Sequence, residues 1–135
     1  MGVKKGFTII ELFVIVLIFG TAVVFFWVQK NRVDAAARDS HRKIAINAIY
    51  HNLEHYHDLH GYYPEMAEMA DWEERLRAMD PQLFTDPFGF FIGMPEGMSD
   101  YRYEPTGCDK EGRCRSFTLR SRLEREADFI RGSRR

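Results

Sequence analysis

The chain of 135 residues contains few cysteines, few prolines and no stretch of strongly biased composition. The sequence has two cysteines but no second pair of metal ligands at the spacing of a zinc site, so a structural zinc ion is disfavoured. No proline precedes Pro64, and residues 28–60 include neither proline nor glycine, so nothing in this stretch interrupts a long helix. Internal repeats and Ser/Gly-rich linkers are also missing, which disfavours a repeat array or a flexibly tethered second domain.

What the chain does have is one long apolar run. The 22 residues from Phe7 to Val28 contain a single strongly polar side chain, the carboxylate of Glu11. About 20 apolar residues suffice for a helix to cross a membrane, and a lone acid there costs a few kcal/mol unless it has a partner. A secretory signal peptide would end in a small-residue site, where this chain has the bulky residues 25–27. We therefore expect a transmembrane helix whose acid has a function.

The charges at the two ends of this run predict its orientation. Lys4 and Lys5 precede it and favour a cytoplasmic amino terminus, although Lys30 and Arg32 on the other side reduce the bias. The predicted protein crosses the plasma membrane once, and most of the chain lies outside the cytoplasm.

The residues at the start of the apolar run form a recognisable motif. Basic Lys4 and Lys5 precede Gly6, and Phe7-Thr8-Ile9-Ile10-Glu11 then opens the apolar segment. This pattern resembles the amino-terminal motif of type IV pilins and pseudopilins. The resemblance covers roughly the first quarter of the chain. It implies that a prepilin peptidase cuts between Gly6 and Phe7, that the new amine of Phe7 is methylated, and that Glu11 meets this amine on a neighbouring subunit.

The resemblance also implies partners and a destination. The expected partners are a prepilin peptidase/methyltransferase, other pilin subunits in a homo- or heteropolymer, the membrane and an inner-membrane assembly platform. The expected end state is a cell-surface filament. One alternative is a pseudopilin of a type II secretion system, since Asp86-Pro87-Phe88-Gly89 resembles the Asp-Pro-Trp-Gly turn of the major pseudopilin. Another is a membrane-anchored module that binds a soluble ligand. The chain departs from many major pilins in having no proline within the anchor helix.

Periodicity predicts an α+β fold in which a long amino-terminal helix carries a small head with an antiparallel sheet. Apolar residues at helical spacing continue beyond the membrane span (Ile46, Ile49, Leu53 and Tyr56). Gly61 and Pro64 then end the helix. Together with the leader peptide (1–6) that the resemblance implies, the predicted segments are a transmembrane helix (7–28), its amphipathic continuation (29–60) and a globular head (61–135).

Within the head, two alternating segments, 101–104 and 116–119, flank Cys108 and Cys114. They predict a β-hairpin closed by a disulfide, which suits an exported domain too small to rely on its core alone. Calcium ligands are too few for a site, since Asp109 and Glu111 stand alone in the cysteine ring.

Two further helices are expected in the head. Met69, Trp72, Leu76 and Met79 predict a short helix that ends before Pro81. A capping-box pattern from Ser121 to Glu124, with apolar residues at 123, 127 and 130, predicts another near the carboxyl terminus. We expect residues 133–135 to be frayed.

The remaining signals do not indicate an enzyme. His51, Glu54 and His55 match a His-x-x-Glu-His zinc motif, but no third ligand is apparent, and we expect no catalytic residue, metal or cofactor. Charge is partitioned, with 7 basic and 3 acidic residues in 1–51, 4 and 14 in 52–112, and 8 and 3 in 113–135. Such zones can be solvated surface or can set the register of stacked subunits. Nucleic-acid binding by the basic tail is disfavoured, because the tail has no aromatic platform.

Overall fold

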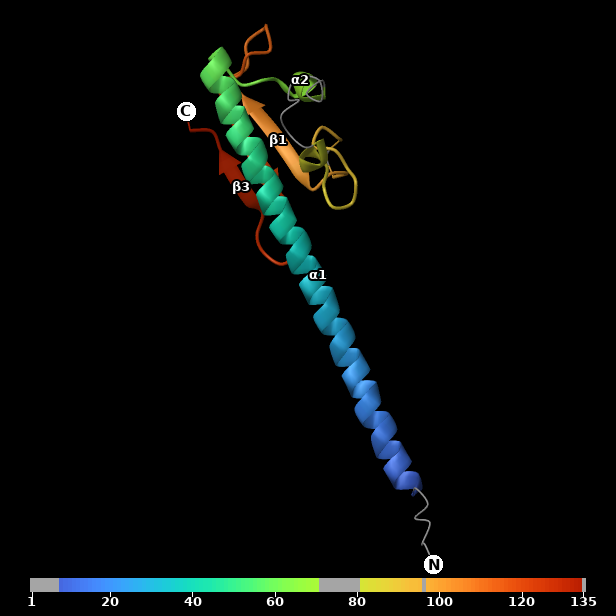
Figure 1. Cartoon of the computed structure of the whole chain (residues 1–135). Coiled ribbons are helices and arrows are strands. Elements are labelled where there is room, and N and C mark those ends of the chain that lie inside the picture. Colours follow the sequence, from blue (N-terminus) through green and yellow to red (C-terminus); the bar gives the residue numbers. More distant parts are fainter. Residues whose placement is uncertain (1–7, 71–80, 96, 135) are drawn as a thin grey trace, which may run out of the picture. The chain divides into compact units, whose positions relative to one another are not determined.

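The computed structural model describes residues 8–70, 81–95 and 97–134. Helix α1 spans Ile9–His60, the short helix α2 spans Met66–Ala70, and a 3₁₀ turn, η1, spans Pro81–Phe84. Three strands follow, namely β1 (Tyr101–Thr106), β2 (Ser116–Ser121) and β3 (Phe129–Gly132). They form one antiparallel sheet in the order β1-β2-β3. The chain therefore has the predicted α+β character (Figure 1).

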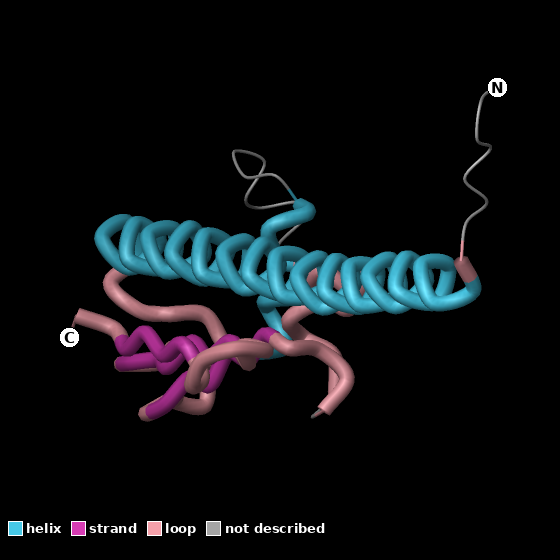
Figure 2. Tube along the Cα trace, turned by 90° about the horizontal axis from the view of Figure 1, so that it is seen from below, coloured by secondary structure: helices cyan, strands magenta, loops and turns pink. Residues whose placement is uncertain are grey.

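The chain divides into two compact units, residues 1–35 and 36–135. The described part of the first unit is the amino-terminal half of α1. The second unit contains the rest of α1 together with the sheet and its loops. Its helical part runs alongside the sheet, and all three strands lie on one side of the helix (Figures 1 and 2). The first unit has no described core of its own, so the hydrophobic core belongs to the second.

The core of the second unit forms where the apolar stripe of α1 meets the sheet. The predicted stripe is confirmed, because Ile46, Ile49 and Leu53 are fully buried and Tyr56 is nearly so. Aromatic residues supply much of the facing surface. The buried residues that join this cluster from the rest of the unit are Tyr63, Met69, Phe84, Ile92, Tyr101, Tyr103, Cys114, Phe117 and Leu119.

The end of α1 agrees with the sequence-based prediction. His60 is its last residue, and Gly61 has a φ of +82°, a left-handed conformation that glycine adopts without a steric penalty. The Gly61 amide donates to the carbonyl of His57 at 2.7 Å, which closes the final turn. Tyr63 then exchanges two backbone hydrogen bonds with Cys114, each 2.9 Å long. The chain leaving the helix is thus tied directly to the hairpin.

The predicted disulfide-closed hairpin is confirmed. β1 and β2 pair in antiparallel register, and a disulfide joins Cys108 to Cys114 in the connecting loop. The Asp109 carboxylate accepts hydrogen bonds from the amides of Glu111 and Arg113, which shapes the loop from within. The turn predicted at 86–89 is also present. The buried Asp86 carboxylate organises it by accepting from the amides of residues 88, 90 and 100, each at 2.9 Å.

The prediction of a carboxyl-terminal helix is wrong. Ser121 ends β2, residues 122–128 form a loop, and Phe129–Gly132 is strand β3. The amides of Glu124 and Arg125 donate to the Asp39 carboxylate of α1, at 2.9 and 3.0 Å, instead of starting a helical turn. Because Asp39 is more than 80 residues away in sequence, the local capping pattern gave no sign of this contact.

The expectation of a frayed end is wrong for residues 133 and 134. The Ser133 amide donates to the Phe117 carbonyl at 3.0 Å, and the Arg134 amide donates to the Glu54 carboxylate at 3.0 Å. The predicted helix around Met69 begins as expected in α2, where Met69 is fully buried. Trp72, Leu76 and Met79, which were expected to continue it, lie outside the described residues.

Candidate functional site

The apolar half of α1 is exposed along its whole length. Every residue from Thr8 to Asp34 is exposed, and the segment is long and apolar enough to cross a membrane. Between Ile9 and Val28 the only charged side chain is that of Glu11. A continuous apolar surface of this extent is unfavourable in water and marks contact with lipid or protein. This half of the helix is therefore the candidate interaction site, with one carboxylate at its amino-terminal end.

Thr8 caps this helix. The amide of Glu11 donates to the Thr8 hydroxyl oxygen at 3.3 Å, and the amide of Leu12 donates to the Thr8 carbonyl at 3.1 Å. Thr8 and Glu11 thus occupy the N-cap and N3 positions of a capping box. A carboxylate at N3 also interacts favourably with the positive end of the helix dipole. The Thr-x-x-Glu spacing is the sequence signal for this role, which the cost of a carboxylate in the membrane does not by itself reveal. Gly6 and Phe7, the predicted cleavage and methylation residues, lie outside the described residues.

A second polar feature lies where the head begins to cover α1. The guanidinium of Arg42 is fully buried and contacts three carboxylates: Asp39 at 2.8 Å, Asp100 at 2.7 Å and Glu124 at 2.9 Å. Arg38, one turn earlier, makes two hydrogen bonds of 2.7 Å to Glu124. We call these five residues the Arg42 cluster. It joins α1 to the loop before β1 and to the loop between β2 and β3.

The electrostatics of the Arg42 cluster favour the charged forms of two of its acids, Asp39 and Glu124. Hydrogen bonds from Arg38, reinforced by Arg42, outweigh desolvation and lower the pKa of Glu124 to about 2. Burial alone would raise the pKa of Asp39. The amides of Glu124 and Arg125, together with Arg42, reverse this effect and hold that pKa below its ordinary value. The cluster is therefore an ionised network that positions two loops of the head on the helix.

The residues of the His-x-x-Glu-His pattern are not brought together as a metal site. Glu54 is buried, and its carboxylate accepts from the Tyr63 hydroxyl at 3.3 Å and from the Arg134 amide at 3.0 Å. His51 and His55 are exposed on the same helix. In the described ranges, no group of three or more His, Cys, Asp or Glu side chains is placed to hold a metal ion. Glu54 instead anchors the chain that follows β3.

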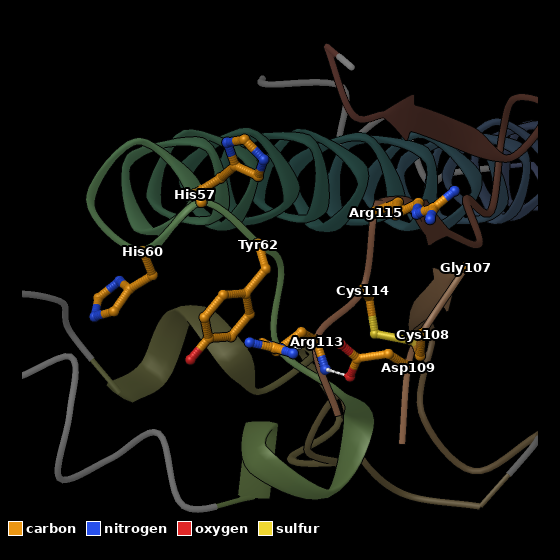
Figure 3. A pocket seen from close by; sticks show the side chains of 10 residues that line it. His57, His60, Tyr62, Gly107, Cys108, Asp109, Arg113, Cys114 and Arg115 are labelled. Carbon is orange, nitrogen blue, oxygen red and sulfur yellow. Dashed lines mark hydrogen bonds and ion pairs between the residues drawn. A yellow bond between two sulfur atoms is a disulfide. The ribbon is translucent and has the colours of Figure 1, made fainter. Parts of the chain in front are cut away.

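A cavity of about 660 Å³ lies between the end of α1 and the disulfide loop (Figure 3). His57, His60 and Tyr62 line one part of it, and Arg113 lies beside the disulfide in another. The Arg113 guanidinium forms ion pairs with Asp109, at 2.9 Å, and with Glu111. These two acids of the hairpin loop thus stabilise it through Arg113.

The sequence-predicted residues belong to different units of the chain. Glu11 lies on the exposed half of α1, and the Cys108–Cys114 disulfide lies in the head. The Arg42 cluster was not predicted, because its members are far apart in the chain and only Asp39 and Arg42 share a helical spacing. In comparisons with protein-family models, curated proteins and solved structures, nothing matches this chain.

Proposed function

We propose that the chain is a structural subunit of a type IV pilus-like filament, which polymerises through the apolar half of α1 after its leader is removed. One observation carries the proposal: an exposed apolar helix of membrane-spanning length holds a single carboxylate next to the Gly6-Phe7 junction. The helix first lies in the membrane and then packs against the same helix of other subunits. Both environments remove from water an apolar surface whose exposure is unfavourable.

Glu11 has a defined task in this proposal. In a subunit surrounded by lipid, its carboxylate costs free energy without a partner. When subunits pack, the methylated amine of Phe7 on one chain reaches Glu11 on another, and their attraction offsets part of both desolvation penalties. Since this gain arises only at one axial offset, the pair selects the step between neighbouring subunits.

The disulfide supports the expected orientation. Disulfides persist in oxidising compartments, so the Cys108–Cys114 bond fits a head outside the cytoplasm. In the proposed sequence of events, the prepilin peptidase/methyltransferase acts on the cytoplasmic side, and an inner-membrane assembly platform then adds the subunit to a filament. Function as a type II secretion pseudopilin is a second candidate, favoured by the turn that Asp86 organises at 86–89.

Processing provides the first test. Mass spectrometry of the amino-terminal peptide from native membranes should find a mature chain that begins at Phe7 with one added methyl group. Replacement of Gly6 by a larger residue should block cleavage, because the peptidase must pass the scissile backbone through a narrow site. An assembled protein that retains residues 1–6 would contradict the proposal and favour a membrane-anchored binding module.

Glu11 is both the charge of the apolar segment and a residue of the helix cap, so the test must separate these two roles. Glu11→Leu removes both the charge and the capping-box side chain, whereas Glu11→Gln removes the charge but retains a residue that serves in a capping box. Thr8→Ala is the matched control, since it weakens the cap and leaves the charge. We expect both Glu11 variants to be processed and inserted normally but to yield few or misregistered filaments, and Thr8→Ala to assemble.

Filaments sheared from cells are imaged beside blots of the membrane fraction. Normal filaments from Glu11→Gln would show that the charge is dispensable and that Glu11 serves only the helix cap. Normal filaments from Glu11→Leu would show that assembly needs neither the charge of Glu11 nor its side chain in the helix cap.

A further inference from the structure

Aromatic and basic side chains surround α1 where its apolar run ends. Phe25, Phe26 and Trp27 are exposed, and so are Lys30 and Arg32, which follow about one helical turn later. We call these five residues the aromatic-basic belt. They all belong to the first unit and to one unbroken stretch of helix. Among the residues that the structure describes, neither cation of the belt forms an ion pair, so both are available to a ligand.

The side chains of the belt point in all directions around the helix. Lys30 and Arg32 are two positions apart, which at 3.6 residues per turn is a rotation of about 200° and places them on opposite sides. The three aromatic residues are consecutive, so each is rotated by about 100° from the one before it. A surface for one protein partner would gather such side chains on a single face. A belt that faces every direction instead fits a surrounding medium, and a lipid bilayer is such a medium.

The order of residues along the axis matches the layers of a membrane surface. The apolar run comes first, the aromatic residues follow, and the basic residues come last. Aromatic side chains favour the boundary between hydrocarbon and headgroups, and long basic side chains reach past this boundary toward the phosphates. Asp34 is the nearest acid in the sequence, and it comes a further turn away from the apolar run. The two cations therefore meet the headgroup layer before this carboxylate does.

The orientation of the helix gives no reason for these two cations. Basic residues favour the cytoplasmic side of a membrane, and Lys30 and Arg32 lie at the opposite end of the span from the basic pair that precedes it. Neutral polar residues at these positions would end the apolar run equally well and would leave a stronger orientation signal. The pattern therefore indicates a use for positive charge at this end of the span.

We propose that the aromatic-basic belt binds the headgroups of anionic phospholipids, in the leaflet on the carboxyl-terminal side of the span. The guanidinium of Arg32 donates paired, charge-assisted hydrogen bonds to a lipid phosphate, and the ammonium of Lys30 attracts a second lipid as a point charge. Anionic lipids are favoured over zwitterionic lipids, because a zwitterionic headgroup carries a cation of its own. This inference rests on the membrane stage of the proposed function and does not depend on filament assembly.

A belt held at the headgroups also sets the depth of Glu11. The helix rises about 28 Å between Glu11 and Lys30, at 1.5 Å per residue. The hydrocarbon core of a bilayer is about 30 Å thick, so Glu11 then lies at the opposite edge of the core and not at its centre. A carboxylate near the interface is less costly than one at the centre. The lipid contact thus keeps the proposed assembly carboxylate close to the cytoplasmic headgroups until subunits pack.

Fluorescence quenching by brominated lipids tests the contact in the full-length protein, reconstituted in phosphatidylcholine vesicles. Phosphatidylglycerol with brominated acyl chains is compared with brominated phosphatidylcholine at equal mole fraction. The protein has two tryptophans, so Trp27→Phe measures the signal of Trp72, which is then subtracted. We expect phosphatidylglycerol to bind beside Trp27 about five times more strongly than phosphatidylcholine, the effect of one cation near an anionic headgroup.

Paired variants locate the charges responsible. Lys30→Gln combined with Arg32→Gln should lower the ratio of the two binding constants to about 1. Lys4→Gln combined with Lys5→Gln is the matched control, because it removes the same number of cations from the other end of the span. This control should leave the ratio unchanged.

Equal quenching by the two lipids in the unchanged chain would overturn the inference and leave the proposed function standing. A preference that survives loss of Lys30 and Arg32, or that disappears in the control, would overturn it as well. Bromines near the headgroup should quench Trp27 more strongly than bromines near the chain ends, and the opposite order would place the belt inside the hydrocarbon core and refute it. Absence of quenching by either lipid would refute the membrane stage on which this inference and the proposed function both rest.

Discussion

Replacement of Arg42 by methionine should destabilise the head more than any other single change to its charges. Methionine keeps much of the buried volume but removes the guanidinium that contacts Asp39, Asp100 and Glu124. Removing one partner of a buried ion pair costs about 3–5 kcal/mol, because the remaining charge stays desolvated.

The geometry places the expected loss at the lower end of this range. Asp39 keeps two backbone hydrogen bonds, Glu124 keeps Arg38, and Asp100 is partly exposed. We therefore expect Arg42→Met to lower the free energy of unfolding by about 3 kcal/mol. A domain of this size has a total stability of about 5–15 kcal/mol, so the change is large but leaves a folded state to measure.

Urea unfolding of the full-length protein in a mild detergent, followed by near-ultraviolet circular dichroism, measures this loss. Lys43→Met is the matched control, since it removes the neighbouring cation, whose pair with Glu126 is exposed to solvent. Exposed pairs contribute about 0–1 kcal/mol, so this variant should stay close to the unchanged chain. If Arg42→Met costs no more than Lys43→Met, the buried cluster does not hold the loops as inferred.

Three further changes test separate parts of the head. Replacing Cys108 or Cys114 by serine should lower the free energy of unfolding by about 2 kcal/mol in the chain-entropy model. Reductant should then have no additional effect on unfolding. Quantitative labelling of both thiols in the untreated native protein would contradict the bond. Acidification from pH 4.5 to about 2 should destabilise the head, because Glu124 has a lower pKa in the folded chain and is therefore protonated first in the unfolded chain. If Glu124→Gln leaves the slope of stability against pH unchanged, that assignment is refuted. Gly61→Ala should cost about 1 kcal/mol by urea unfolding, since alanine is strained at a φ of +82°, and an unaltered midpoint would show that the chain relaxes there without cost.

The parts of the fold that the sequence predicted correctly depend on local signals. The helix ends at His60 because Gly61 and Pro64 act on neighbouring backbone, and the hairpin forms where two alternating segments flank a turn. The prediction failed at residues 121–130, where a capping-box pattern suggested a helix and the chain forms a loop and β3. The amides that would begin that helix are held by Asp39, a contact that no local pattern encodes.

The candidate site divides in the same way. The motif around Gly6, Phe7 and Glu11 is linear and could be read directly, together with the apolar run that follows it. The Arg42 cluster could not be read, because its acids reach Arg42 through loops whose course the sequence does not reveal. Charge counts define acidic and basic zones along the sequence, but they cannot tell which charges become buried partners within one head.

The position of the Arg42 cluster on α1 suggests why the protein tolerates so costly an arrangement. Asp39 and Arg42 are the first buried residues of the helix, and the apolar stripe begins only at Ala45. Apolar contacts are weakly directional, so a loop resting on the stripe alone could slide along the helix with little loss. A guanidinium with three fixed carboxylates allows one register, and any displaced position would leave buried charges unpaired. The cluster therefore contributes more to the placement of the two loops on α1 than to net stability. In the proposed filament, that placement would let the head present the same surface in every copy.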